Sequence, residues 1–155
     1  MMKKLFLLCG LLMATNGWTE DDSKNKEFLS FLDSEWKYTL SQSPVYATAM
    51  GIKGYETEWR DNSLEAIQNR AAHRENTLKK LKSFNAINLS KSNQLNLRLF
   101  SQLTTIDLEI SHFNRHLLPF GHRGGVQLAH EDAEVIPLES FKDFSFWIKR
   151  LKNLD

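Results

Sequence analysis

Residues 90–117, SKSNQLNLRLFSQLTTIDLEISHFNRHL, decide the fold class of this chain. Large apolar residues recur in them at steps of four, four, three, four, three and four, the spacing of one face of an α-helix. These residues are Leu95, Leu99, Leu103, Ile106, Ile110, Phe113 and Leu117. A second stripe beside the first consists of Leu97, Phe100, Thr104 and Leu108. A helix with two adjacent apolar stripes packs against two or more partners, so we expect it to be the central helix.

Further helices are predicted on both sides of this stretch. A four-residue apolar repeat predicts one over about 26–41. Pro44 suits the first turn of a short second helix, which Gly51 and Gly54 bring to an end. These two helices lie close together in the sequence, so a short turn must join them.

A connector and two more helices complete the prediction. Asn62 or Ser63 can cap a helix that runs to about Phe84, and we expect Tyr55 and Trp59 to pin the preceding connector to the core. A last helix starts behind a cap at Ser140 and carries an apolar face at helical spacing. That face consists of Phe141, Phe144, Trp147, Ile148, Leu151 and Leu154.

The fold class that follows is all-α. The 155 residues fit one domain, they contain only seven Gly and three Pro, and no strand-type alternation of comparable length occurs. We predict an irregular multi-helix bundle of about four main helices plus a short one. One long loop, Pro119–Pro137, interrupts it.

The N-terminus has the composition of an export signal. Lys3 and Lys4 precede a ten-residue apolar run, Leu5–Ala14, which is too short to span a membrane. We interpret 1–17 as a signal peptide and expect the protein to be periplasmic or extracellular. An uncleaved N-terminal anchor is the alternative interpretation.

The rest of the chain divides into a loose polar N-terminus, 18–25, and a helical region, 26–155. The single cysteine, Cys9, lies inside the predicted signal, so no disulfide framework is expected. Twenty basic and nineteen acidic residues give a net charge of +1, without a basic block. Nucleic acid is therefore not an expected partner, nor is a membrane beyond the signal peptide.

His112 and His116 are weak candidates for metal binding. Their i, i+4 spacing places both on one helical face, as zinc ligands require. In the metallopeptidase motif a glutamate follows the first histidine, but here that position is Phe113. Glu109 and His112 also have the Glu-x-x-His spacing of di-iron bundles, although no second such pair occurs. The alternative is a pair of histidines on a solvated face.

The glycine-rich loop is the segment we expect to contact a ligand or a partner domain. Its glycines allow close backbone approach, and its arginine and exposed N–H groups could hold a carboxylate or a phosphate. The alternative is a connector shaped only by its backbone. The candidate residues are Pro119, Phe120, Gly121, His122, Arg123, Gly124, Gly125 and Gln127.

The order of several short segments resembles a known family. They are Ser43-Pro44, Ala47-Thr48, Gly51, Tyr55, Asp61, Pro119-Phe120, Gly124-Gly125-Val126-Gln127 and 141–151. Together they resemble the N-terminal part of the bacterial proteins grouped as domain of unknown function family 885. Those proteins are helical, often exported, and similar to zinc metallopeptidases of the gluzincin type. The resemblance covers about Phe28–Asp155.

The resemblance implies an inactive helical N-terminal fragment of a longer, peptidase-like protein. The zinc-binding His-Glu-x-x-His helix of the family lies in its later part, so no zinc or other cofactor and no catalytic residue is expected in this chain. The expected partner is that C-terminal catalytic region, with a peptide as substrate of the full-length protein. Whether the protein is an enzyme stays open. The alternative is a complete small periplasmic binding or adaptor module that uses its last helix as a partner interface.

Overall fold

A computed structural model of the protein describes residues 22–114, 117 and 125–154. Their regular secondary structure is entirely helical, which confirms the predicted all-α class. The α-helices are α1 (Asp22–Ser41), α2 (Pro44–Ala49), α3 (Leu64–Ser83), α4 (Lys91–Ser111) and α5 (Phe141–Lys152). Two 3-10 segments, η1 (Ala86–Asn88) and η3 (Val126–Glu134), accompany them. The predicted signal peptide lies outside the described residues.

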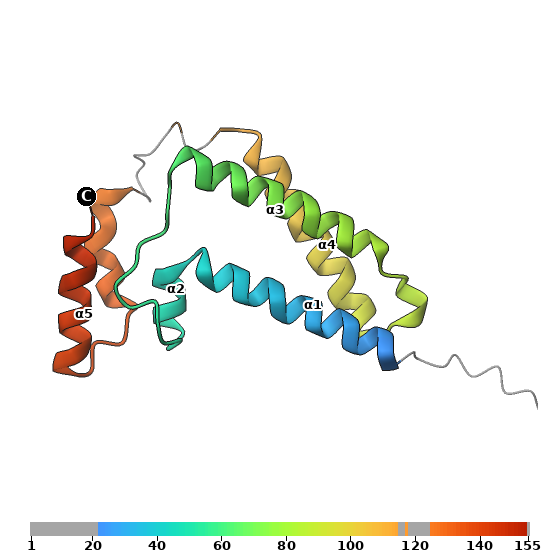
Figure 1. The fold of residues 1–155 in the computed structure, drawn as a ribbon, viewed down its shortest axis with the longest axis horizontal. Helices are drawn as coiled ribbons and strands as arrows, with labels where there is room; N and C mark the ends of the chain where they lie inside the picture. Colours follow the sequence, from blue (N-terminus) through green and yellow to red (C-terminus); the bar gives the residue numbers. More distant parts are fainter. Residues whose placement is uncertain (1–21, 115–116, 118–124, 155) are drawn as a thin grey trace, which may run out of the picture.

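The helices form an open, elongated arrangement. In Figure 1, α3 and α4 cross closely, and α1 approaches both of them at its N-terminal end. From there α1 and α3 diverge toward α2, while α5 and η3 lie side by side at the far end. Within the described ranges, no helix combines the length and apolarity that crossing a membrane requires.

The apolar core occupies the end where α1 and α3 converge. Its buried members are Phe28, Leu81, Leu89 and Leu97, and the partly buried Phe31, Leu32, Phe84 and Phe100 pack against them. The rings of Phe28 and Phe84 meet edge to face with centroids 5.1 Å apart. Aromatic pairs in this geometry add stability beyond the area that they bury.

Side-chain caps set the starts of the later helices, as predicted. The Ser63 hydroxyl accepts from the N–H of Ala66, and the Ser90 hydroxyl accepts from the N–H of Asn93, both at 3.2 Å. Ser140 and Asp143 form a reciprocal capping box on α5. Each cap satisfies N–H groups that the first turn of a helix leaves unpaired.

Two predicted irregular segments are helical instead. The first helix begins at Asp22, so the part of 18–25 that the structure describes is not loose. Lys26 pairs with Asp22 one turn away, with 2.6 Å between Nζ and Oδ2, and such i, i+4 pairs support a helix terminus. Residues 126–134 of the predicted loop form η3, so this part of Pro119–Pro137 is helical.

The prediction for the central helix is wrong in one respect. The helix ends at Ser111, before Phe113 and Leu117 of the predicted stripe, and the part of that stripe on α4 faces outward, with Leu99 51% and Leu103 59% exposed. The second stripe packs inward instead, with Leu97 only 7% and Thr104 only 5% exposed. A helical period shows which residues share a face, but it does not show which face meets a partner.

The connector after α2 is pinned to α5. The indole N–H of Trp59 donates to the carbonyl oxygen of Arg150 at 2.6 Å, and the rings of Trp59 and Trp147 lie 6.2 Å apart. The side-chain amide of Asn153 donates to the carbonyl oxygen of Thr57 at 3.1 Å. These contacts confirm that Trp59 anchors the connector, although its partner is the last helix and not the apolar core.

Candidate functional site

The described part of the predicted glycine-rich loop is the start of η3. Gly125 has a φ of +128°, a backbone conformation that other residues rarely adopt, and the exposed Gln127 follows it. The other candidates, Pro119, Phe120, Gly121, His122, Arg123 and Gly124, lie outside the described residues. The proposed ligand contact of this loop therefore stays a prediction.

The histidine pair is only half described. His112 is exposed and ends α4, where its N–H donates to the carbonyl oxygen of Glu109 at 3.1 Å. His116 lies outside the described residues. Across the described ranges, no group of three or more His, Cys, Asp or Glu side chains is placed to hold a metal ion.

The structure gathers polar side chains in another place, between α1, α3 and α4. They line a cavity of about 230 Å³, which we call the polar pocket. The α1 and α3 residues that line it come after the core residue Phe28 on α1 and before the core residue Leu81 on α3. Its lining residues are Glu35, Tyr38, Thr39, Gln42, Ser43, Arg60, Arg70, His73, Arg74, Thr77, Phe100, Thr104 and Asp107.

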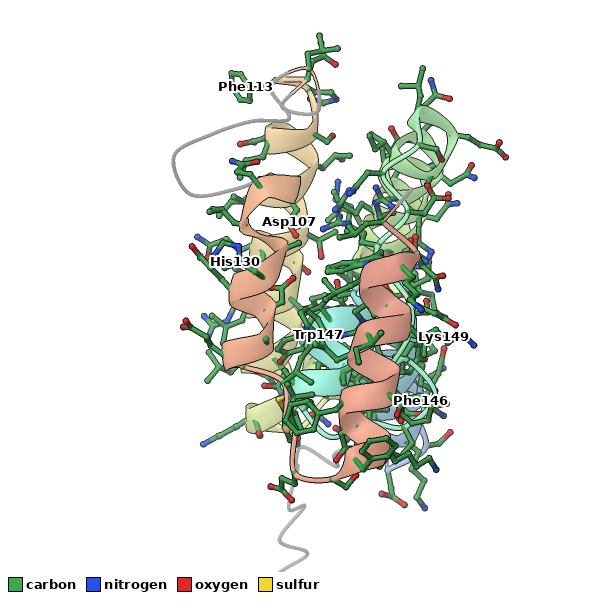
Figure 2. The ribbon with its side chains drawn as sticks, turned by 90° about the vertical axis from the view of Figure 1, so that its left-hand side faces the viewer. Asp107, Phe113, His130, Phe146, Trp147 and Lys149 are labelled. Carbon is green, nitrogen blue, oxygen red and sulfur yellow. The ribbon has the colours of Figure 1, made fainter. Side chains whose placement is uncertain are left out.

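Helical spacing brings these side chains together. Three residues of α1 together with Gln42, which directly follows the helix, repeat at i, i+3, i+4 and i+7, as do four residues of α3, so each set lies along one face. The first set is Glu35, Tyr38, Thr39 and Gln42, and the α3 set is Arg70, His73, Arg74 and Thr77. Asp107 reaches the pocket from α4, and Figure 2 shows it on the side of α4 nearer to α3.

A hydrogen-bonded cluster joins α1 to α3 inside the pocket. One carboxylate oxygen of Glu35, Oε2, lies 3.0 Å from Nε2 of His73 and accepts the Thr77 hydroxyl hydrogen bond at 3.0 Å. The His73 ring also stacks on Tyr38, with centroids 3.5 Å apart and an interplanar angle of 16°. Glu35 and Tyr38 together fix the position and orientation of the imidazole.

Three arginines form the cationic side of the pocket. Arg70 is 5% exposed, and its Nη1 donates to the carbonyl oxygen of Asp61 at 2.7 Å. Burial lowers the pKa of Arg70, and repulsion from Arg60 and Arg74 lowers it further. The guanidinium groups are therefore near enough to raise one another's electrostatic free energy.

Tyr38 supplies a neutral hydroxyl among these charges. Burial raises the pKa of its phenol, an effect that the positive charges of Arg70 and Arg74 oppose. Desolvation is the larger cause, so the phenol keeps its proton at neutral pH. Tyr38 is accordingly able to donate a hydrogen bond into the pocket.

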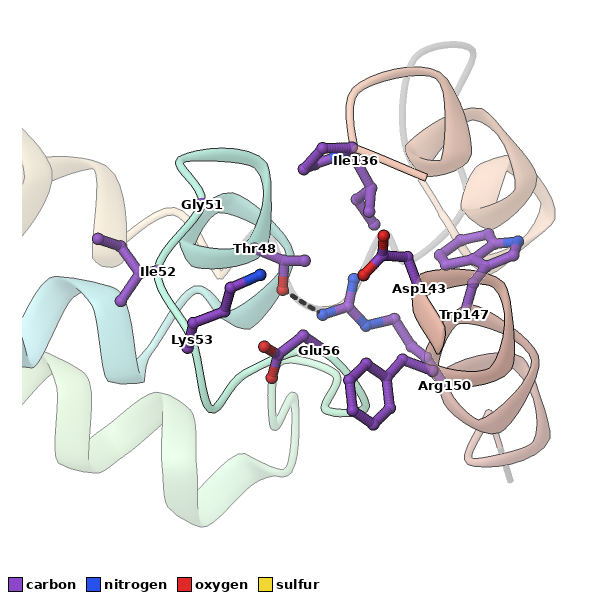
Figure 3. Close-up of a pocket in the computed structure, with 11 residues that line it drawn as sticks. Thr48, Gly51, Ile52, Lys53, Glu56, Ile136, Asp143, Trp147 and Arg150 are labelled. Atoms are coloured by element: carbon purple, nitrogen blue, oxygen red, sulfur yellow. Dashed lines mark hydrogen bonds between the residues drawn. The ribbon is translucent and has the colours of Figure 1, made fainter. Parts of the chain in front are cut away.

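A second, much smaller cavity surrounds the buried guanidinium of Arg150. Its volume is about 20 Å³, room for about one water molecule. Arg150 is fully buried, and its Nη2 donates to the Thr48 hydroxyl at 2.6 Å (Figure 3). The same Nη2 donates to the carbonyl oxygen of Tyr55 at 2.5 Å. Its Nε and Nη1 are buried without a hydrogen-bond partner among the described residues. This arginine fastens α5 to α2 and the connector.

The sequence contained a signal for the polar pocket. Two polar sets at i, i+3, i+4 and i+7, on predicted helices, indicate two polar helix faces. The residues Arg70, His73 and Arg74 lie mostly off the apolar stripe of their helix, which favours a solvated face. Only the packing of α1 beside α3 turns these two faces toward one cavity.

Comparisons of the chain with known protein families, with curated proteins and with solved structures give no match.

Proposed function

We propose that this chain is a helical scaffold of an exported protein and that it packs a further folded region against the outer face of α4. The single observation that supports this role is the first apolar stripe of α4, which we call the α4 apolar face. Its members are Leu95 (48% exposed), Leu99 (51%), Leu103 (59%), Ile106 (40%) and Ile110 (39%), and the exposed Phe113 (77%) and Leu117 (69%) follow beyond the end of the helix.

The length and continuity of this face argue for a partner. Scattered exposed apolar residues are normal on protein surfaces, but a continuous row along a helix marks an interaction site. Covering a side chain that is half exposed stabilises a complex by roughly 1 kcal/mol. A row of this length therefore offers several kcal/mol before the entropic cost of association.

The resemblance to family 885 suggests the partner. In that family the region that follows is peptidase-like and carries the zinc-binding His-Glu-x-x-His helix. We propose that such a region packs on the α4 apolar face and supplies the zinc, the general base and most of a peptide-binding cleft. In this proposal the present chain alone is inactive, and export depends on the signal at 1–17.

A second candidate function is favoured by the outer face of α5. Phe141 is 89%, Phe144 50% and Ile148 53% exposed, although Arg150 and Trp147 hold the other face of the helix. Figure 2 shows Trp147 between α5 and η3, whereas Phe146 and Lys149 lie on the far side. An adaptor module would use this α5 face, and not α4, to bind its partner.

Two experiments test the proposal and separate it from the alternative. The first is to sequence the gene beyond the codon for Asp155. An in-frame continuation that encodes His-Glu-x-x-His supports the scaffold function, and a stop codon at that point overturns it.

The second experiment measures apolar dye binding by the full chain. The double variant Leu99→Gln/Leu103→Gln removes the centre of the α4 apolar face, and Phe144→Gln/Ile148→Gln is the matched change on α5. The scaffold function predicts that the α4 variant loses more dye fluorescence than the α5 variant. It also predicts that the α4 variant no longer binds the region encoded beyond Asp155 when that region is added as a separate polypeptide. Loss of partner binding only in the α5 variant would favour the adaptor.

A further inference from the structure

We infer that the polar pocket binds an oxyanion, that is, the carboxylate or phosphate group of a small molecule. The inference is independent of the proposed scaffold function, because it rests on the residues between α1, α3 and α4 and not on the outer face of α4.

The charges of the pocket leave a cationic excess. Three guanidinium groups line it, against the carboxylates of Glu35 and Asp107, while the Asp61 carboxylate, which is not a lining group, attracts Arg70. Glu35 already has His73 and Thr77 as partners, at 3.0 Å each. Among the described residues, the ion pairs within 4.0 Å include none made by these three arginines. Their charges are therefore not neutralised by direct contact.

The burial of polar groups argues against a merely solvated surface. Arg70, Thr77 and Thr104 are each only 5% exposed. Hydrogen bonds to Glu35 and to the Phe100 carbonyl oxygen compensate Thr77 and Thr104 for leaving water, whereas the charge of Arg70 faces only a neutral acceptor in its bond to the Asp61 carbonyl oxygen. Arg60 and Arg74 also repel Arg70, an effect that attraction to Asp61 opposes, so folding brings like charges near one another at a partly buried place. An anion placed among the three guanidinium groups would remove that repulsion.

The donors suit an oxyanion in both type and arrangement. A guanidinium presents a planar fork of N–H groups that matches two oxygens of a carboxylate or phosphate. Arg60 comes from the connector and Arg74 from α3, while the protonated Tyr38 adds a hydroxyl from α1. Donors from separate elements can surround an anion on several sides.

The pocket has room for such a ligand. Its volume of about 230 Å³ exceeds by far the ~10–15 Å³ that one water molecule needs. The stacked pair of Tyr38 and His73, held by Glu35, forms a fixed wall. A wall that is already in place lowers the entropic cost of binding.

The test is isothermal titration of the full chain with inorganic phosphate and, separately, with succinate, at constant ionic strength set by sodium chloride. We expect saturable binding of one molecule per chain in at least one arm. Binding of phosphate alone identifies the phosphate class, and binding of succinate alone identifies the carboxylate class. The titrations extend to tens of millimolar ligand, about tenfold above the 1 mM dissociation constant of a weak complex. Absence of saturable binding of both ligands over this range would overturn the inference.

Variants show whether the pocket is the site. Arg60→Gln and Arg74→Gln each remove one charged donor, and each is expected to raise Kd about tenfold. Arg98→Gln removes an exposed arginine of α4 outside the pocket and is expected to leave Kd unchanged within about twofold. Equal weakening by all three variants would show nonspecific attraction and would contradict the assignment. Arg60 lies outside the helices and is exposed, so its variant keeps the test valid if Arg74→Gln unfolds.

Discussion

Arg150 on the last helix and Thr48 on α2 are joined by a buried hydrogen bond of 2.6 Å between Nη2 and Oγ1. The two residues are 102 positions apart in the sequence. With the Trp59 bond to the Arg150 carbonyl, this contact attaches α5 to the rest of the molecule. The attachment depends on polar contacts of one side chain more than on an extended apolar interface.

The first prediction concerns this attachment. Arg150→Ala removes a fully buried side chain together with both of its hydrogen bonds, and we expect the free energy of unfolding to fall by about 2–4 kcal/mol. Thr48→Val leaves the guanidinium with one partner fewer and should cost about 1–3 kcal/mol. Urea unfolding measures both. The exposed neighbour Lys149 is the control, and Lys149→Ala is expected to change stability by less than about 0.5 kcal/mol.

Hydrogen exchange locates the effect of the Arg150 change. Amides of α5 are expected to exchange faster in Arg150→Ala, while amides of α1 near Phe28 keep their protection. Uniform loss of protection over both helices would contradict the view that Arg150 fastens α5 alone.

The second prediction compares two leucines of α4. Leu97 is 7% exposed and belongs to the core, whereas Leu103 is 59% exposed. We expect Leu97→Ala to cost about 2–4 kcal/mol, because it leaves a cavity, and Leu103→Ala to cost less than about 0.5 kcal/mol. Thermal or urea unfolding of the full chain measures both variants. A larger loss from Leu103→Ala would mean that the first stripe is the buried one.

The third prediction is a pH dependence at Asp132. Burial raises the pKa of this carboxyl, an effect that attraction to Arg150 opposes. A raised pKa means that the folded state holds the proton to a higher pH than the unfolded state does. The free energy of unfolding therefore falls as pH rises through that pKa. Asparagine at this position stays neutral, so it avoids this decrease in the free energy of unfolding.

We accordingly expect Asp132→Asn to be more stable than the parent chain at pH 7 and equal to it near pH 3, roughly one unit below the ordinary aspartate pKa. Urea unfolding at the two values of pH measures the difference. Glu134→Gln, at an exposed position of the same 3-10 segment, is the control, and its stability relative to the parent chain should be the same at both values of pH. A variant that is less stable at neutral pH would mean that attraction to Arg150 outweighs burial.

The fourth prediction concerns zinc. The full chain is expected to purify without stoichiometric zinc and without peptidase activity, because the proposed function places the zinc-binding helix in a further region that packs on this chain. Elemental analysis and a peptide-cleavage assay measure the two properties. One zinc ion per chain, lost on His112→Ala, would show instead that His112 belongs to a metal site.

Local features of the fold could be predicted from the sequence, and long-range ones could not. The caps at Ser63, Ser90 and Ser140 act within one helical turn, so their residues reveal them directly. The orientation of α4 depends on partners that lie elsewhere in the chain. For this reason the stronger apolar period was assigned to the core, although the weaker one packs there.

The same distinction applies to the candidate site. Glu35 and His73 are 38 positions apart and meet only because α1 lies beside α3. Arginine is a residue type that usually lies on the protein surface, yet packing leaves Arg70 only 5% exposed. The spacing of polar residues within each helix does not indicate that two polar helix faces line one cavity.

The convergence of α1 and α3 on one apolar cluster also distributes rigidity unevenly along the molecule. Phe28, Leu81 and Leu97 hold the vertex of a V, and burial there supplies most of the cohesion between its arms. Toward the mouth of the V, hydrogen bonds and ring stacking connect the arms instead. The separation of the arms at the mouth therefore depends on a few directional contacts made by Glu35 and Tyr38, whereas the vertex depends on many shared apolar contacts.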